Sequence, residues 1–273
     1  MAANICANPN RWFHQANTAD KIQRALLPAN GYEAVEVDLS FKSGLVYLAH
    51  HKDDSNVDTS LSHFLSILIK TPHRFIIKFD FKDTTAITEG LALIGLSNVS
   101  SHHTIISNVD GVPGPAGSPH VLMSGLEFAA LVRQNIPDSE VSIGLNDKWH
   151  VATLWFSHGY TSQNARMLAS IPNATSALRM TILSQTKSDV VESLFNHRKI
   201  LVWGEAGVFE ALWLSNNEHL CLDGDVWGPG LWVIGQYAWL FTLMLLVGVL
   251  WCWLFPAKTK AAYRHIPADS PST

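Results

Sequence analysis

Ionisable residues lie on one face of two segments that otherwise have the character of buried strands. Residues 34–39 and 74–82 both alternate apolar side chains with charged ones. Because successive strand side chains point to opposite faces, each strand has one apolar face and one charged face. The charged face carries Glu36 and Asp38 in the first segment, and Lys78, Asp80 and Lys82 in the second. Burying unpaired charge is costly, so these side chains require partners or a bound cation.

The rest of the chain predicts the fold around these two strands. From about residue 11 to residue 224, strand-like runs alternate with helix-like segments. We predict strands at 10–14, 34–40, 74–81, 104–110, 140–146, 175–183, 200–205 and 219–223, and helices at 18–27, 59–70, 86–96, 124–134, 161–170, 186–197 and 207–215. This order predicts an α/β fold, a TIM-like (β/α)8 barrel whose eighth helix is missing or is replaced by a carboxyl-terminal transmembrane helix. A doubly wound open sheet is the alternative, although it normally has fewer strands.

The carboxyl-terminal part of the chain differs in composition from the rest. Residues 231–255 contain no charged side chain, and tryptophans lie near both ends of the segment. As a helix, this segment would extend roughly 37 Å, enough to cross a hydrocarbon core of about 30 Å with some tilt. We therefore predict three parts, namely a barrel over 8–225, a transmembrane helix over 231–255 and a short polar tail over 256–273.

These features predict a single-pass membrane protein, and two signals for its orientation conflict. The amino terminus lacks the features of a signal peptide, which favours a tail-anchored protein with a cytoplasmic barrel. Lys258, Lys260 and Arg264 follow the apolar segment, which favours a cytoplasmic tail. The sequons at Asn98 and Asn173 fit the second orientation. We favour a barrel on the lumenal or extracellular side.

Composition excludes several function classes. The formal net charge is −4 and no basic run is present, so the sequence does not indicate a nucleic-acid partner. The three cysteines show neither a CxxC pattern nor the Cys/His spacing of a zinc site. A Cys6–Cys221 disulfide and two free thiols are both compatible with the sequence. A signal for catalysis must therefore come from other residue types.

Two histidines and a lysine lie at the ends of predicted strands, beside the three carboxylates. His14 follows the first strand, His50 ends a short run after the second, and Lys82 ends the third. Carboxylate oxygens are suitable ligands for Mg²⁺ or Ca²⁺. The ion and a lysine can neutralise a phosphate, and two histidines can share the proton transfers. The set predicts phosphodiester cleavage.

The same residues carry a resemblance to a known family. The segments are WFHQAN (12–17), VEVD (35–38), LAH (48–50), IKFDFK (77–82), Asn108 before PGPAG (113–117), and VW (202–203). Over about residues 8–225 the chain resembles the menorin family, within the phospholipase C-like/glycerophosphodiester phosphodiesterase TIM-barrel superfamily. The resemblance implies that Glu36, Asp38 and Asp80 bind the metal. It also implies that His14 and His50 are the catalytic pair and that Lys82 holds phosphate.

Simpler interpretations exist for several of these residues. The two carboxylates of residues 34–39 and the lysines Lys78 and Lys82 would form an internal salt-bridge layer without any metal. Trp203 ends a predicted strand and is a candidate for substrate binding, and packing within the barrel explains it equally well. Most of the thirteen histidines are expected to be solvated or structural.

The favoured function is that of a membrane-anchored, metal-dependent phosphodiesterase, a hydrolase or a lyase, acting on a lipid or glycerophosphodiester-type substrate. The alternative is a catalytically silent membrane module that binds a phosphate-bearing ligand or a protein. The complete set of six site residues favours the enzyme, because a degenerate relative would be expected to have lost at least one.

Overall fold

A computed structural model describes residues 11–55, 57–114, 121–146, 159–183, 185–195, 199–204 and 220–223. The chain divides into two compact units, Met1–Trp227 and Gly228–Thr273. All described residues belong to the first unit, so the fold is that unit's fold.

The order of elements agrees with the alternation of strands and helices predicted from the sequence. The strands are β1 (Trp12–Phe13), β2 (Ala34–Lys42), β3 (Leu45–Leu48), β4 (Ile76–Phe81), β5 (Thr104–Pro113), β6 (Glu140–Asn146), β7 (Ala174–Arg179), β8 (Ile200–Trp203) and β9 (Leu220–Asp223). The helices are α1 (Ala19–Leu26), α2 (Leu61–Lys70), α3 (Thr84–Ser97), α4 (Gly125–Asn135), α6 (Ser162–Ala169), α7 (Met180–Leu183) and α8 (Ser188–Phe195), with short 3₁₀ turns η2 (Pro28–Asn30) and η3 (Val99–Ser101). Each of the eight predicted strands is present, whereas the predicted helix at 207–215 lies outside the described residues.

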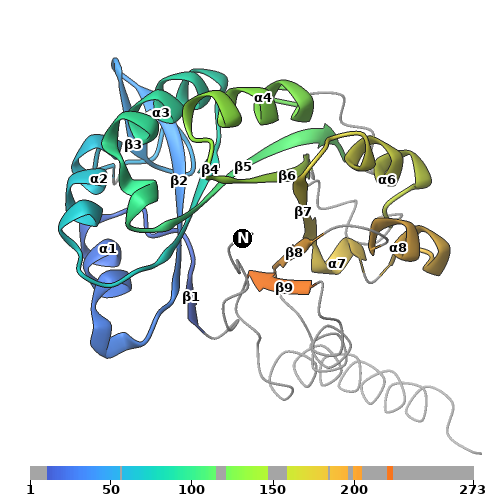
Figure 1. Ribbon diagram of the computed structural model, residues 1–273, viewed down its shortest axis with the longest axis horizontal. Helices are drawn as coiled ribbons and strands as arrows, with labels where there is room; N and C mark the ends of the chain where they lie inside the picture. The colour runs from blue at the N-terminus through green and yellow to red at the C-terminus, as the bar shows by residue number, and fades with distance from the viewer. Residues whose placement is uncertain are drawn as a thin grey trace, which may run out of the picture. The chain divides into compact units, whose positions relative to one another are not determined.

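The strands form one curled sheet. Its order is β1-β2-β4-β5-β6-β7-β8-β9, with every neighbouring pair parallel, and β3 adds to β2 in antiparallel orientation. Figure 1 shows the sheet bending around a central space, with α1, α2, α3 and α4 on its outer side. The sheet therefore has a helix-covered convex face and a concave face.

The prediction of a closed TIM-like barrel is wrong. Along the described strands the hydrogen-bonded path begins at β1 and ends at β9, and no ladder joins these two. Closure requires the first and last strands to pair, and β1 has only two residues, whose described partners are on β2. The architecture is an open, curled half-barrel. A doubly wound sheet does not describe it either, because the strand order does not reverse.

The predicted single-pass membrane protein is also contradicted. In the part of the chain that the structure describes, no helix has the length and apolar character needed to cross a bilayer. The longest described helix, α3, has 14 residues, fewer than the roughly 20 that a bilayer requires. The predicted span 231–255 and the tail 256–273 lie outside the described residues.

Polar residues fix where five helices begin. Thr18, Ser60, Asp83, Ser124 and Thr161 precede α1, α2, α3, α4 and α6, and each side chain accepts a backbone N–H from the first turn. Such a cap stabilises a helix by about 1 kcal/mol. Asp83 follows β4 and the charged segment directly, so its cap sets where α3 leaves the sheet.

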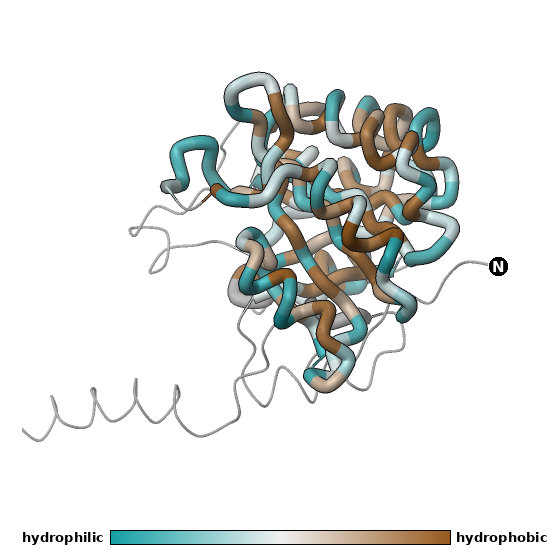
Figure 2. Tube along the Cα trace, turned by 90° about the vertical axis from the view of Figure 1, so that its left-hand side faces the viewer, coloured by the Kyte–Doolittle hydropathy of each residue, from teal (hydrophilic) through white to brown (hydrophobic). Residues whose placement is uncertain are grey.

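Apolar packing occurs on both faces of the sheet. The larger core lies between the sheet and its helices, where Phe64 packs edge-on against Phe79, and Phe81 against Phe128. A smaller cluster contains Trp12, Ala34, Ile106 and Leu201, with Ile76 packed against it. Figure 2 shows hydrophobic residues concentrated along the strands. Ala34 and Ile106 lie two residues before Glu36 and Asn108, so the smaller cluster is the apolar floor of the polar concave face.

Candidate metal centre

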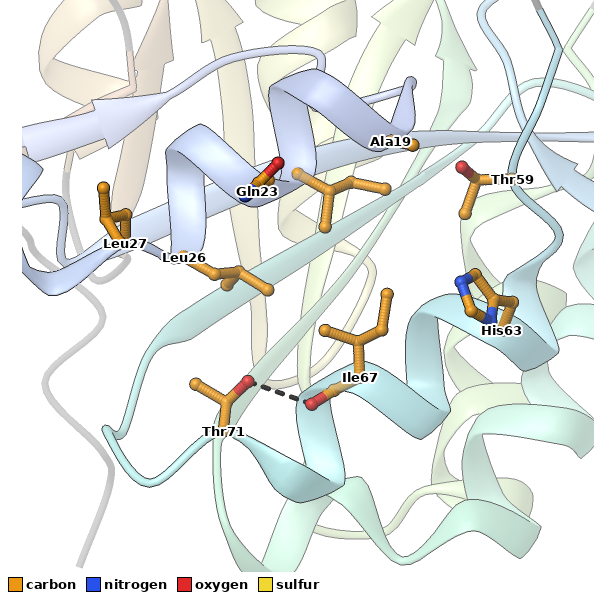
Figure 3. A pocket seen from close by; sticks show the side chains of 9 residues that line it. Ala19, Gln23, Leu26, Leu27, Thr59, His63, Ile67 and Thr71 are labelled. Atoms are coloured by element: carbon orange, nitrogen blue, oxygen red, sulfur yellow. Dashed lines mark hydrogen bonds between the residues drawn. The ribbon is translucent and has the colours of Figure 1, made fainter.

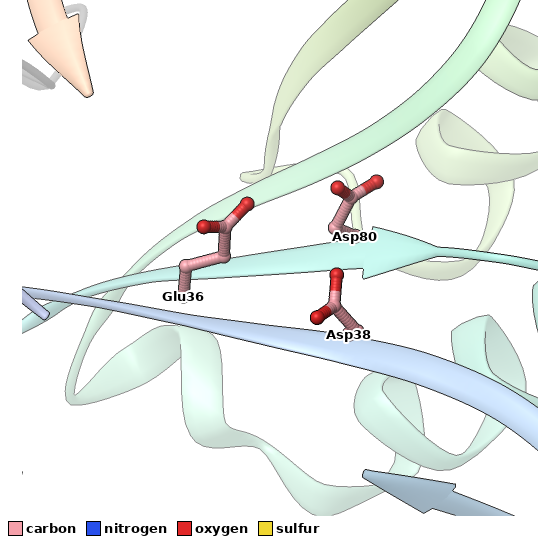
Figure 4. Close-up of side chains that lie close together, drawn as sticks. All are labelled: Glu36, Asp38 and Asp80. Atoms are coloured by element: carbon pink, nitrogen blue, oxygen red, sulfur yellow. The ribbon is translucent and has the colours of Figure 1, made fainter. Parts of the chain in front are cut away.

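Three carboxylates from two neighbouring strands meet on the concave face. Glu36 and Asp38 lie two residues apart on β2, and Asp80 on β4 pairs in register with Asp38. All three side chains are buried, and one ligand oxygen from each lies within 4.8 Å of the others. Figure 4 shows the three side chains rising from β2 and β4 on the same side. This arrangement brings three hard oxygen donors close enough to hold one Mg²⁺ or Ca²⁺ ion.

Two lysines from the same face of the sheet neutralise part of this charge. Lys78 Nζ lies 2.9 Å from Glu36 Oε1. Lys82 Nζ lies 2.6 Å from Asp80 Oδ2 and 3.1 Å from Asp38 Oδ1. The internal salt-bridge layer considered from the sequence is therefore present together with the carboxylate cluster.

Ion pairs keep the carboxylates of Glu36 and Asp38 charged despite their burial. Burial alone would raise the pKa of Glu36, but the Lys78 ammonium and His14 hold that pKa well below its usual range. Burial also works against ionisation of Asp38, and contacts with His50 and Lys82 lower its pKa nonetheless. Ionised carboxylates are the form that binds a metal ion.

Both predicted histidines contact this cluster. His14 Nδ1 lies 2.5 Å from Glu36 Oε2, so Glu36 accepts the Nδ1 proton and the ring's other nitrogen, Nε2, is the basic one in the neutral form. His50 Nδ1 lies at an ion-pair distance of 3.3 Å from Asp38 Oδ2. The interaction with Asp38 outweighs burial and raises the pKa of His50. The half-exposed His50 is thereby favoured in its protonated form more than a solvated histidine.

Amide and hydroxyl groups orient the carboxylates. Asn17 and Asn108 belong to segments that carry the family resemblance, which implied no role for them, and Ser142 belongs to none of these segments. Asn17 Nδ2 donates to Asp38 Oδ2 at 2.7 Å, and Asn17 Oδ1 accepts the Asp38 backbone N–H at 2.9 Å. Asn108 Nδ2 donates to Asp80 Oδ1 at 2.9 Å. Ser142 Oγ in turn donates to Asn108 Oδ1 at 2.7 Å. Such supporting bonds fix the direction in which the ligand oxygens point.

A fourth carboxylate, Asp110, was missed from the sequence. It lies on β5, where its neighbour across the ladder is Gly144. Burial and the nearby Asp80 raise the pKa of Asp110 to about 6, against the influence of Lys82. A polar residue two positions after Asn108 near the end of a strand was the available signal, because both then share one face.

The charges around the site are out of balance in a way that suits a divalent cation. The four carboxylates are those of Glu36, Asp38, Asp80 and Asp110. They face the ammonium groups of Lys78 and Lys82, so the ionised set is two positive charges short when both histidines are neutral and one short when His50 is protonated. The all-oxygen donor set fits Mg²⁺ or Ca²⁺ better than a soft metal.

Trp203 is placed apart from the other predicted site residues. His14, Glu36, Asp38, His50, Asp80 and Lys82 form one connected set of contacts. Trp203 instead ends β8, where the Arg179 guanidinium carbon lies 5.1 Å from its ring centroid. Arg179 and Trp203 are neighbours in the β7–β8 ladder. A cation–π contact at the carboxyl ends of two strands is compatible with both substrate binding and packing.

A groove on the convex side of the sheet is separate from this chemistry. It has a volume of about 300 Å³ and lies between α1 and α2 (Figure 3). Its lining residues are Ala19, Ile22, Gln23, Leu26, Leu27, Thr59, His63, Ile67 and Thr71. None of them belongs to the carboxylate cluster, so the groove is not the candidate site.

Comparison with protein families gives nearly the same boundaries as the folded part of the chain described above. The family model of the Menorin N-terminal domain matches residues 9–223. This stretch contains every residue of the cluster. A search of curated proteins found no match.

Proposed function

The chain belongs to the menorin family, and on that premise we propose that it is a metal-dependent phosphodiesterase of the phospholipase C-like/glycerophosphodiester phosphodiesterase superfamily. Its substrate would be a lipid or glycerophosphodiester-type molecule. The observation that carries the proposal is the convergence of Glu36, Asp38 and Asp80 within 4.8 Å, with Lys82 and two histidines in contact with them. Neither carboxylates nor lysines alone would suggest this chemistry, whereas the combination suits a phosphate ester.

The carboxylates of Glu36, Asp38 and Asp80 would hold a Mg²⁺ or Ca²⁺ ion. When bound, such an ion withdraws charge from phosphate oxygens and stabilises the charge that develops in the transition state. Asn17 and Asn108 keep the aspartate oxygens directed to the same point. The apolar floor of the concave face limits water beneath the site, which strengthens electrostatic interactions there.

Lys82 and the two histidines would act on the substrate. Although burial favours a neutral amine, Asp80 and Asp38 raise the pKa of Lys82, so its ammonium stays charged and can bind a phosphate oxygen. The His14 Nδ1–Glu36 contact leaves Nε2 as the proton acceptor for a nucleophilic hydroxyl or water. His50, whose pKa is raised, is suited to give a proton to the leaving oxygen. This assignment makes His14 the general base and His50 the general acid.

A catalytically silent binding module is the second candidate, and one observation favours it. Lys78 and Lys82 already pair with the three carboxylates, so the cluster is partly neutralised without an ion. In that case the pocket would bind a phosphate-bearing ligand or a protein partner without turnover. The two candidates differ in whether the carboxylates bind a divalent ion.

Metal titration and a substrate panel distinguish these candidates. Mn²⁺ binding to purified protein is measured by electron paramagnetic resonance, and hydrolysis of lysophospholipids, sphingomyelin and glycerophosphodiesters is measured with Mg²⁺ or Ca²⁺. Asp80→Asn should abolish both binding and turnover, and His14→Ala should abolish turnover while metal binding persists. Asp138→Asn, the same change at an exposed loop position, is the matched control. Failure of the wild-type protein to bind Mn²⁺ would refute the enzyme and leave the binding module.

A further inference from the structure

The two histidines of the candidate site lie on two different loops. His14 begins the β1–α1 loop, which covers residues 14–18, and His50 lies on the β3–α2 loop, which is described over 49–55 and 57–60. The proposed function assigns the general base to the first loop and the general acid to the second. Because small misplacements of catalytic groups lower rates strongly, the way in which the two loops are joined matters for turnover.

Both loops contact the same carboxylate oxygen. Asn17, on the β1–α1 loop, donates its Nδ2 proton to Asp38 Oδ2 at 2.7 Å. His50 Nδ1, on the β3–α2 loop, lies 3.3 Å from that same oxygen. Asn17 Oδ1 also accepts the backbone N–H of Asp38 at 2.9 Å. The two loops therefore meet at Asp38, and a shift of either loop would disturb one of these contacts.

A second contact joins the two loops away from the carboxylate cluster. Asp58, near the end of the β3–α2 loop, accepts the backbone N–H of Ala19 through both of its oxygens, at 3.1 Å to Oδ1 and 3.3 Å to Oδ2. Ala19 is the first residue of α1 and follows the β1–α1 loop directly. Figure 3 shows Ala19 and Thr59 at the same end of the groove between α1 and α2. Asp58 therefore fastens the end of one loop to the end of the other.

This bond does more than begin a helix. Thr18 already serves as the N-cap of α1, where its side chain accepts the backbone N–H of Lys21. Asp58 is separated from Ala19 by 39 positions in the sequence, so its bond is a tertiary contact between two elements. A carboxylate at the amino end of a helix makes a charge-assisted hydrogen bond in a favourable field, which strengthens this contact.

Asp58 is itself held in place by its neighbour. Thr59 Oγ1 donates to Asp58 Oδ1 at 2.7 Å. Thr59 is buried, and its carbonyl accepts the backbone N–H of Leu48, the last residue of β3, at 3.0 Å. The position of Asp58 is thus tied to the end of β3, two residues before His50. The start of α1 is thereby linked to the strand end from which the His50 loop departs.

Resting on the proposed function, we propose that Asp58 is a positioning residue, which joins the β1–α1 and β3–α2 loops so that His14 and His50 keep a fixed relation around Asp38. Asp58 would contact neither the substrate nor the reacting atoms. A backbone bond from Ala16 N–H to the Glu36 carbonyl, 2.8 Å long, holds the first half of the β1–α1 loop. The contact made by Asp58 acts on the second half, which carries Asn17.

Hydrogen exchange measures this coupling without any substrate. The backbone N–H of Asp38 is bonded to Asn17 Oδ1, so its exchange rate reports whether the second half of the β1–α1 loop stays in place. In nuclear magnetic resonance experiments on metal-free, full-length protein, Asp58→Ala should speed exchange of this amide by about fivefold or more. Asp58→Asn keeps an Oδ1 acceptor for both donors and should exchange nearly as the wild type does.

A matched control separates this coupling from a general loss of stability. Ser124→Ala removes a bond of the same kind at α4, where Ser124 Oγ accepts the backbone N–H of Glu127 at 3.2 Å. This variant should leave exchange of the Asp38 amide unchanged. Unchanged exchange in Asp58→Ala, or equal acceleration in Ser124→Ala, would overturn the proposal.

Steady-state kinetics with the substrate panel tests the consequence for turnover. Asp58→Ala should lower kcat by about 10–10²-fold with KM changed by less than about twofold, and Asp58→Asn should restore most of the loss. An active wild type whose kcat is unaffected in Asp58→Ala would also overturn the proposal. A wild type without turnover would instead refute the proposed function, while exchange of the Asp38 amide would still decide whether Asp58 joins the loops.

Discussion

Substitution of Lys78 by methionine tests how the site remains charged inside the protein. Lys78 is only 3% exposed, and its ammonium lies 2.9 Å from Glu36 Oε1. Methionine approximates the length of the lysine stem but removes the charge, so the buried Glu36 carboxylate loses its strongest attraction. Removing one partner of a buried ion pair costs about 3–5 kcal/mol of unfolding free energy. We expect Lys78→Met to lower the free energy of unfolding by an amount in that range at neutral pH without metal.

The pKa of Glu36 determines how the stability difference between Lys78→Met and the wild type changes with pH. In the wild type the folded pKa of Glu36 lies below its unfolded value, so its contribution to stability is present above the unfolded pKa and is lost as pH falls through the folded pKa. Without Lys78, only His14 opposes the effect of burial, so we expect the folded pKa of Glu36 to be higher in the variant than in the wild type. The variant then loses less stability than the wild type as pH falls, so the difference between them should shrink toward about pH 4.

Urea unfolding at several pH values, with a chelator present, measures the effect. Lys52→Met at an exposed turn is the control and should change stability by less than about 0.5 kcal/mol. The double variant Lys78→Met/Glu36→Gln removes both charges and should recover much of the loss. The argument that the buried Glu36 charge depends on Lys78 would be refuted by either of two results. One is a loss of less than about 1 kcal/mol of unfolding free energy in Lys78→Met, and the other is no recovery of stability in the double variant.

Three further predictions concern the histidines and the second lysine. His50→Ala should lower phosphodiesterase turnover by about 10²–10⁴-fold with unchanged Mn²⁺ affinity, measured by steady-state kinetics and metal titration. Burial lowers the pKa of His103, so the unfolded state takes up more protons as pH falls through about 6.5. His103→Gln should therefore lose less stability than the wild type between about pH 7 and 5 in urea unfolding, whereas His63→Gln, at an exposed position, should follow the wild type. Lys82→Met should bind Mn²⁺ at least about tenfold more tightly than the wild type, because the Lys82 ammonium repels the ion. The same variant should turn substrate over more slowly, because that ammonium also binds the phosphate. Weaker Mn²⁺ binding in the variant would contradict this role.

The charged faces of β2 and β4 could be predicted because strand alternation is local. Glu36 and Asp38 share a face from their spacing alone, and parallel strands then bring Asp80 beside them. Closure of the sheet could not be predicted in the same way, because it depends on whether β1 and β9 pair across the whole unit. β1 has only two paired residues, Trp12 and Phe13, where the sequence predicted a strand over 10–14.

The residues that support the site were harder to predict than those that form it. Asn17 and Asn108 are neutral, so the cost of burying charge, which identified the carboxylates, gives no signal for them. Their role depends on hydrogen bonds that only the fold reveals. Trp203 shows the reverse problem. A large aromatic residue at a strand end suggested substrate contact, and its described neighbour is Arg179 rather than the carboxylates.

Lys78 and Lys82 have different roles at the same site. Lys78 lies on the buried side, 3% exposed, and its pair with Glu36 keeps that carboxylate ionised. Lys82 is more exposed and contacts one oxygen each of Asp38 and Asp80. An ion held by these two carboxylates would therefore compete with the Lys82 ammonium for them. Asp110 also attracts this ammonium electrostatically, which gives it a direction in which to move away from the ion.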